Sequence, residues 1–241
     1  GNPQLGSGRV SYVGSSPTAV VSSNQTGGHA PEKDPFHLLR KEIAGAQVAR
    51  IPQLPRFFGG AVGYVSYDFV RRLERLPIAA PIDLPVPDLQ FALFDLITAF
   101  DHDENRIHII FCPSAKRFLG EDRSKLLREG LDRIADCEAD YIAPTSSDPV
   151  ISTTSFVPEQ SRDAYLDRVE RCQRYIAAGD IYQANLSHRF NFRIPDRYRK
   201  PPERLRYEQA LYRRLASVNP APFAGLLRFN DLTLISASPE R

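Results

Sequence analysis

The sequence lacks the features that mark membrane, secreted and nucleic-acid-binding proteins. Its 241 residues contain no apolar run near the roughly 20 residues that a membrane helix needs, and no signal peptide is recognisable at the N-terminus. Lys plus Arg number 31 against 29 for Asp plus Glu, and a net charge of +2 is too balanced for a dedicated nucleic-acid binder. We therefore expect a cytoplasmic protein with no nucleic-acid or membrane partner.

Cysteine is scarce and methionine is absent. Cys112, Cys137 and Cys172 are odd in number and too far apart for a disulfide framework or for zinc ligand pairs, so we expect reduced thiols. A chain without methionine is not expected to begin at its natural start, and its final Ser-Pro-Glu-Arg is expected to be an interruption. The remaining composition, 42% apolar and 25% charged, is that of an ordinary globular protein.

Hydrophobic periodicity predicts a mixed α/β chain. Short runs of strand-forming residues predict strands at 9–14, 18–21 and 181–192, and hairpins that join 89–100 to 106–112 and 223–229 to 232–236. Apolar residues three and four apart predict helices at 35–45, around 127–134, at 161–179 and at 204–217. The second of these helices would bury Leu127, Leu131 and Ile134. A Pro/Ser/Thr-rich stretch at 143–158 predicts a boundary between domains of residues 1–155 and 156–241.

Three short segments could have a binding or catalytic function, and each also has a purely structural explanation. Glycines 59, 60 and 63 interrupt a strand-like run and predict close backbone approach, a bulge or positive φ, because their spacing is not that of a phosphate loop. Asp101-His102-Asp103 suits proton chemistry but is more typical of a solvated turn. The basic run 197–214 suits nucleic acid, but its prolines and acids favour a solvated face. The five histidines form no metal-ligand pattern.

Several segments in the correct order resemble component I of the chorismate-utilising enzymes, which include anthranilate, aminodeoxychorismate, isochorismate and salicylate synthases. They are 8–14 (GRVSYVG), 58–68 (FGGAVGYVSYD), 87–88 (PD) with 100–102 (FDH), 178–187 (AGDIYQANLS), 219–223 (NPAPF) and 236–241 (SASPER). The resemblance implies a two-domain α/β sandwich in which helices cover antiparallel sheets. It also implies that the C-terminal part of the second domain is missing.

Within this family, two residues favour the aminodeoxychorismate branch, which makes the p-aminobenzoate precursor of folate. Asn185 stands where anthranilate synthases usually have an aliphatic residue. Arg241 after Ser-Pro-Glu is also more usual in the aminodeoxychorismate branch. The implied reaction replaces the C4 hydroxyl of chorismate with ammonia from a glutamine amidotransferase partner. Mg²⁺ is the implied cofactor, with ligands expected in the missing part, so the chain alone is expected to be inactive. Anthranilate synthase stays open as an alternative.

The resemblance assigns roles to a few residues of this chain. Glu240 is the expected general acid, which would need a raised pKa, although its carboxylate could instead pair with Arg241 at a strand end. Asn219, Pro220, Pro222 and Phe223 match a segment that lines a tryptophan pocket, and a helix terminator with a turn explains them equally well. A non-catalytic fragment that binds tryptophan or the amidotransferase is therefore the second alternative. We expect residues 182–185 to be core or supporting residues.

Overall fold

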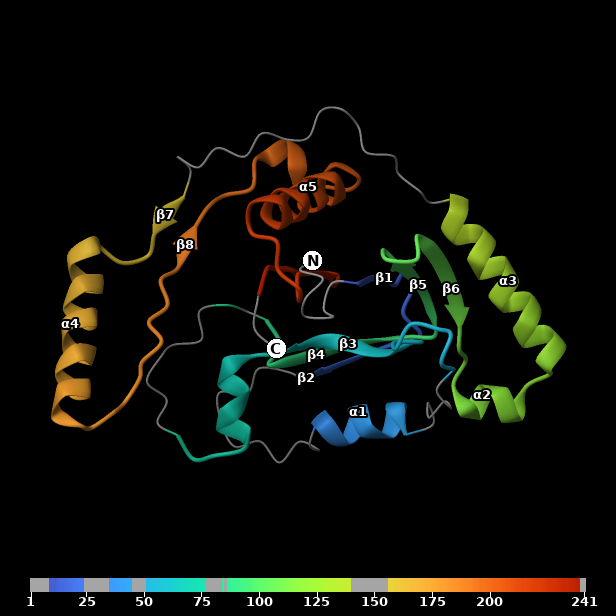
Figure 1. Ribbon diagram of the computed structural model, residues 1–241, viewed down its shortest axis with the longest axis horizontal. Coiled ribbons are helices and arrows are strands. Elements are labelled where there is room, and N and C mark those ends of the chain that lie inside the picture. Colours follow the sequence, from blue (N-terminus) through green and yellow to red (C-terminus); the bar gives the residue numbers. More distant parts are fainter. Residues whose placement is uncertain are drawn as a thin grey trace. The chain divides into compact units, whose positions relative to one another are not determined.

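The computed structural model describes residues 9–23, 35–44, 51–76, 84, 86–139 and 156–238 (Figure 1). The chain divides into two compact units. Unit 1 comprises Gly1–Ala143 and Leu215–Arg241, and unit 2 comprises Pro144–Arg214. Residues 140–155 lie outside the description, so the domain boundary predicted at residue 155 stays a prediction.

The described residues of unit 1 form three antiparallel sheets, and in two of them strands pair with partners far away in the sequence. The first has the order β1 (Val10–Val13), β5 (Leu96–Asp101), β6 (Arg106–Phe111), and the second β2 (Ala19–Ser23), β4 (Leu89–Phe94), β3 (Gly60–Val65). The third is the predicted hairpin of β9 (Gly225–Arg228) and β10 (Thr233–Ser236). The predicted strands at the N-terminus are thus present, but β1 and β2 belong to different sheets.

The predicted long strand at 89–100 is wrong in one respect, because the chain changes sheet at Asp95. β4 ends at Phe94 and β5 begins at Leu96. The Asp95 carboxylate is almost fully buried and lies 2.8 Å from Arg133 and 3.6 Å from Arg117, and its carbonyl accepts a hydrogen bond from the Cys112 amide. Two basic side chains therefore compensate an acid that the change of sheet places inside.

The main core of unit 1 lies on the sheet β2-β4-β3. Val21, Leu89 and Leu93 pack there with Phe69, which belongs to the 3₁₀ helix η2 (Tyr67–Arg72). Helix α1 (Pro35–Ile43) adds Phe36, whose ring meets that of Phe69 edge to face at 5.0 Å. The helix predicted from residue 35 is confirmed, and Figure 1 shows α1 alongside this sheet.

Helices α2 (Ala115–Gly120) and α3 (Arg123–Ala139) follow β6. The predicted apolar stripe of α3 is wrong for two of its members, because Leu127 is 64% and Leu131 57% exposed. The buried residues are Leu126 and Gly130, and a Cβ on Gly130 would lie 2.5 Å from the Phe111 ring. Because α3 packs closely on β6 at Gly130, Leu127 and Leu131 lie on the exposed side of the helix.

Unit 2 contains α4 (Arg162–Ala178), the short hairpin of β7 (Val157–Pro158) and β8 (Phe190–Asn191), and the 3₁₀ helix η4 (Asp196–Tyr198). It also holds most of α5 (Glu203–Val218), whose last turn belongs to unit 1. Both helices were predicted. α4 begins where Ser161 Oγ accepts the Ala164 amide at 3.2 Å and ends at Gly179 in the left-handed conformation, with φ of 81°.

The strand predicted at 181–192 is wrong over most of its length. Only Phe190 and Asn191 are in a strand, and they pair with Pro158 and Val157. Residues 181–189 have no regular structure, although the sequence predicts a strand here. Within the described chain they have no strand to pair with, and a strand pattern without a partner cannot form a sheet.

Candidate functional site

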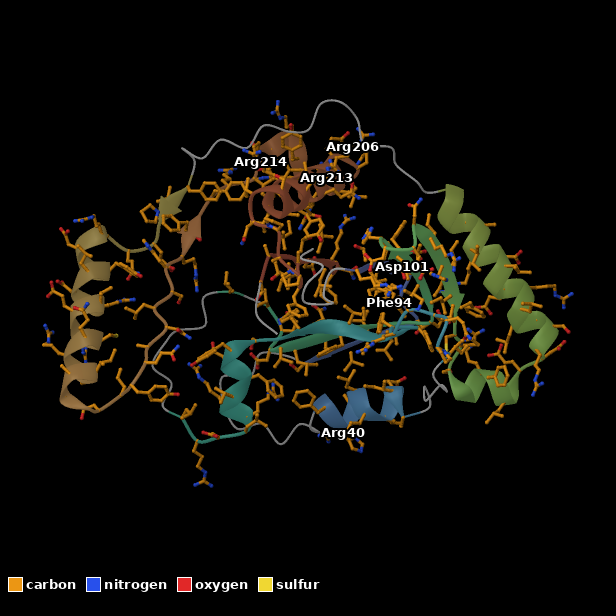
Figure 2. The ribbon with its side chains drawn as sticks, in the orientation of Figure 1. Arg40, Phe94, Asp101, Arg206, Arg213 and Arg214 are labelled. Atoms are coloured by element: carbon orange, nitrogen blue, oxygen red, sulfur yellow. The ribbon has the colours of Figure 1, made fainter. Side chains whose placement is uncertain are left out.

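The pairing of β1 with β5 brings two of the sequence segments together, because residue 10 lies opposite residue 101. The Arg9 guanidinium donates to both carboxylate oxygens of Asp101, with Nη2 to Oδ2 at 2.9 Å and Nε to Oδ1 at 3.3 Å. Asp101, labelled in Figure 2, also accepts the amides of Asp103 and Glu104 at 3.1 Å each. The Arg9 hydrogen bonds and the Glu104 amide lower the pKa of Asp101.

The same pairing places Ser11 Oγ 2.7 Å from His102 Nε2, on an exposed part of the sheet. A serine beside a histidine can act as a nucleophile when an acid orients the histidine ring. Here the adjacent acid, Asp101, is bound to Arg9 and to the turn amides. The contacts of 101–104 therefore fit the solvated-turn interpretation, in which Asp101 closes the β5–β6 turn and anchors β1.

The glycine segment is confirmed as a place of close approach and positive φ. Gly59 and Gly60 have φ of 138° and 122°. At Gly63, in β3, an added Cβ would overlap the Gln90 carbonyl oxygen and lie 2.6 Å from the Phe91 Cα atom of β4. These glycines therefore serve packing between strands, in agreement with the interpretation that rejects a phosphate loop.

Tyr64 follows in the same strand, and sequence reasoning gave it no role. Its hydroxyl donates to the Pro87 carbonyl at 2.9 Å, and its ring meets Phe229, at the end of β9, edge to face at 6.0 Å. Burial, with a smaller contribution from the Asp88 carboxylate, raises the pKa of Tyr64. The sequence signals for this residue were its position beside Gly63 and within the family segment 58–68, and the contact with Phe229 depends on tertiary structure.

The predicted tryptophan segment lies between α5 and β9. Asn219 and Pro220 are exposed, Pro222 is half-buried and Phe223 is 42% exposed. The Asn219 amide nitrogen of the main chain donates to Leu215, and its side chain donates to the Ala237 carbonyl at 3.3 Å. The segment therefore ends the helix and turns the chain, while its pocket role stays a prediction.

The contact of Asn219 with Ala237 connects the two C-terminal motif segments, 219–223 and 236–241. Ser236 ends β10, and residues 236–238 are half-buried. The predicted general acid, Glu240, and its neighbour Arg241 lie outside the described residues. The position of the carboxylate therefore remains a prediction.

Residues 182–185 differ from expectation. Tyr182 is 93% exposed, and Gln183 and Asn185 are also exposed, with a weak hydrogen bond of 3.5 Å between their side chains. The expectation that these residues lie in the core is therefore wrong, and a supporting role at the site stays a prediction. In the basic run, Arg204 is bound to Glu208 at 2.7 Å and the Arg197 guanidinium lies 4.6 Å from the centroid of the Tyr198 ring. Figure 2 labels three further arginines of α5.

No cluster of three or more His, Cys, Asp or Glu side chains suited to a metal occurs among the described residues. The implied Mg²⁺ site, with ligands expected in the missing part of the family fold, stays a prediction. Cys112 and Cys172 are free thiols, and burial raises the pKa of Cys112, with a further contribution from Asp95. Over the same described residues, no helix has the length and apolarity for a membrane span.

The chain combines a mixed α/β fold of antiparallel sheets with sequence segments that occur in a fixed order. These two features define the class of protein with which the chain is compared. The family model described as "chorismate binding enzyme" matches residues 4–241. The chain belongs to this family, as the resemblance predicted.

Relatives of two kinds are similar to the chain. It is 37% identical over 211 residues to anthranilate synthase component 1 of Thermus thermophilus (86% of the chain, 41% of the relative). It is 27% identical over 241 residues to aminodeoxychorismate synthase component 1 of Bacillus subtilis (97% and 48%). The crystal structure of anthranilate synthase component I from Streptococcus pneumoniae superposes with a TM-score of 0.74 at 24% identity, over 96% of this chain and 50% of that one. The chain thus spans half or less of each protein.

Proposed function

We propose that the chain is a part of component I of an aminodeoxychorismate synthase, in which ammonia replaces the C4 hydroxyl of chorismate. The observation that carries this choice is Asn185 within the segment 178–187, because an amide at this position favours that branch over anthranilate synthases. The aminodeoxychorismate synthase of Bacillus subtilis, similar over 97% of the chain, supports it.

The reaction requires addition of ammonia and loss of the C4 oxygen. Hydroxide is a poor leaving group, so the oxygen departs as water once an acid supplies a proton. We assign this proton to the Glu240 carboxyl group, and general acid catalysis of this kind typically contributes about 10²- to 10⁴-fold. The ammonia is proposed to come from a glutamine-hydrolysing partner, because the relatives are named as first components. Since the chain spans about half of them, it is proposed to be inactive alone.

Anthranilate synthesis is the second candidate. The 37% identity to the Thermus thermophilus anthranilate synthase, over 86% of the chain, favours it. The two reactions share chorismate and ammonia. The first places the amino group at C4, whereas anthranilate carries it on the ring carbon next to the carboxylate and also requires elimination of pyruvate to become aromatic. The product therefore distinguishes them directly.

The test is product analysis of the intact natural protein with chorismate and ammonium. We expect aminodeoxychorismate and no fluorescent anthranilate. Anthranilate as the main product would replace the first candidate with the second, and turnover to neither product would overturn both. Glu240→Gln should lower kcat at least about a hundredfold. Glu74→Gln, at an exposed position after η2, serves as the control and should leave kcat unchanged.

A further inference from the structure

The motif segment 178–187 of unit 2 is held between the two ends of helix α4. It starts at the C-terminal end of the helix, where Gly179 has a φ of 81°. The rest of the segment has no regular structure, and Figure 1 shows the chain running back from the end of α4 to β8. The residue that follows the segment, His188, reaches the first turn of the same helix, where its ring stacks on the Tyr165 ring at 5.3 Å.

The length of the segment does not by itself fix its position along the helix. From Tyr165 to Gly179 the helix advances about 21 Å, at about 1.5 Å per residue. The chain from Gly179 to His188 could reach about 30 Å if it were fully extended. Because the chain is longer than the distance that it spans, the contact made by His188 determines where the segment ends on the helix. A shift of this contact would move every side chain of the segment, including that of Asn185.

The His188 ring is held through its two faces. The Tyr165 ring of α4 lies nearly parallel to it, at an interplanar angle of 18°, and the Phe190 ring of β8 lies 4.4 Å away. The Nε2 atom of His188 is buried and has no hydrogen-bond partner among the described residues. Ring contacts of this kind stabilise a structure beyond the area that they bury. The shape of the ring, and not a hydrogen bond at Nε2, therefore holds residue 188 on the helix.

The hairpin that carries Phe190 is attached to the same end of the helix. Two residues separate β7 from Ser161, the residue that caps α4. The Glu159 amide donates to the Arg189 carbonyl at 3.0 Å, and the two side chains form an ion pair at 3.3 Å. The ring stack thus fixes the hairpin against α4, and the hairpin in turn fixes the end of the motif segment.

We propose that His188 and Tyr165 are positioning residues for the reaction, because their stack holds the segment 178–187, and with it Asn185, in place on α4. This inference rests on the proposed function, which makes Asn185 the residue that distinguishes the two branches. Functional residues on irregular segments depend on a rigid element that positions them. A displacement of about 1 Å at such a segment can lower a rate by about a hundredfold.

Steady-state kinetics of the intact natural protein test this proposal, with chorismate consumption in ammonium counted per folded molecule. His188→Ala should lower kcat/KM for chorismate at least about tenfold, because it releases the segment. His188→Phe keeps both ring faces and removes the unpartnered nitrogen, so it should stay within about threefold of the wild type. If His188→Ala fails to fold, His188→Leu fills the same space without a flat ring and should lower kcat/KM at least about fivefold.

A double-mutant cycle shows whether the two rings act together. Tyr165→Ala should lower kcat/KM as much as His188→Ala, and the double variant should lose no more than the larger single loss, because both changes remove the same contact. Tyr175→Ala is the matched control. It lies in the last turn of the same helix, its hydroxyl accepts from Arg171 at 3.1 Å, and its loss should change kcat/KM less than about twofold.

Hydrogen exchange of the intact protein without chorismate gives a readout that is independent of the reaction. Peptides that cover residues 186–192 should exchange at least about twofold faster in His188→Ala and at the wild-type rate in His188→Phe. Unchanged exchange, a kcat/KM within twofold of the wild type in folded His188→Ala, equal damage by His188→Phe, or additive losses in the cycle would each overturn the proposal. Because chorismate consumption is counted for either product, formation of anthranilate would overturn only the proposed function.

Discussion

Helices α3 of unit 1 and α4 of unit 2 have equal length, 17 residues each, and very different surroundings. α3 packs on a sheet, where Leu126 is 3% exposed and Arg133 reaches the buried Asp95. α4 has no buried residue. An apolar stripe therefore indicates which side of a helix can pack against another element. Whether the residues of that side are buried depends on the element that packs there.

The same contrast holds for the strands. In unit 1, Leu89 and Ala99 are fully buried in central strands that pair on both sides. In unit 2, the only strands among the described residues are the two of the hairpin β7·β8, two residues each. Unit 1 is thus expected to contribute most of the folding stability of the chain.

Glycine substitution should give the largest difference between the units. Gly63→Ala in unit 1 should lower the free energy of unfolding by about 3 kcal/mol, because its Cβ would overlap the backbone of β4, which cannot move as a side chain can. Gly179→Ala in unit 2 should cost only about 1 kcal/mol of local strain, since an added Cβ meets nothing within 4 Å and only the φ of 81° opposes it. Urea unfolding followed by circular dichroism measures both.

If Gly179→Ala lowered the free energy of unfolding as much as Gly63→Ala, the close approach of β3 to β4 would not explain the cost at Gly63. An unchanged m-value is needed for the comparison, because it shows that both variants expose the same surface on unfolding.

The role of the glycine segment could be predicted from sequence, because glycine within a strand pattern has few other uses. The α4 boundaries were equally predictable, since Ser161 and Gly179 are local capping signals. Features that depend on remote partners were not. Asp95 follows an apolar strand, and nothing nearby indicates that two arginines in α2 and α3 will let the chain change sheet there.

The site divides in the same way. The segments of the site could be found from the sequence because the order of the motifs identifies the family. The pairing of β1 with β5 then places the segment that contains Arg9 beside the segment that contains Asp101. The exposure of Tyr182 could not be predicted, because the pattern of residues 181–189 is that of a strand and its pairing partner is absent from the described chain. The sequence therefore predicts the identity of local segments, but it does not predict which side chains become buried by other parts of the fold.

Leucine truncation on the two helices sharpens the comparison. Leu126→Ala should cost about 2–4 kcal/mol, because it leaves a cavity beneath α3. Leu166→Ala, at a position that is 38% exposed on α4, should change stability by no more than about 0.5 kcal/mol in the isolated chain. Thermal or urea unfolding of the two variants gives these values. A cost at Leu166 similar to that at Leu126 would mean that the apolar side of α4 is already covered, which contradicts the difference between the two helices.

The smallest expected effect is the pH dependence of the Arg9–Asp101 contact in unit 1. Because hydrogen bonds from Arg9 lower the pKa of Asp101 in the folded state, its contribution is fully present above the ordinary aspartate pKa of about 3.9. The contribution is lost as pH falls through the lowered folded pKa. The difference in Tm between the wild type and Asp101→Asn should therefore be constant above about pH 5 and shrink as pH falls below about 4.

Asp103→Asn is the matched control, since its carboxylate is 63% exposed and lies 3.5 Å from Arg9. Its Tm difference should be close to zero at every pH, because exposed ion pairs are screened by solvent. High salt should reduce the Asp101 effect only in part, since the backbone amides of residues 103 and 104 also bind this carboxylate. A Tm difference that grows on acidification would show that the protonated acid, and not the carboxylate, holds β1 to the β5–β6 turn.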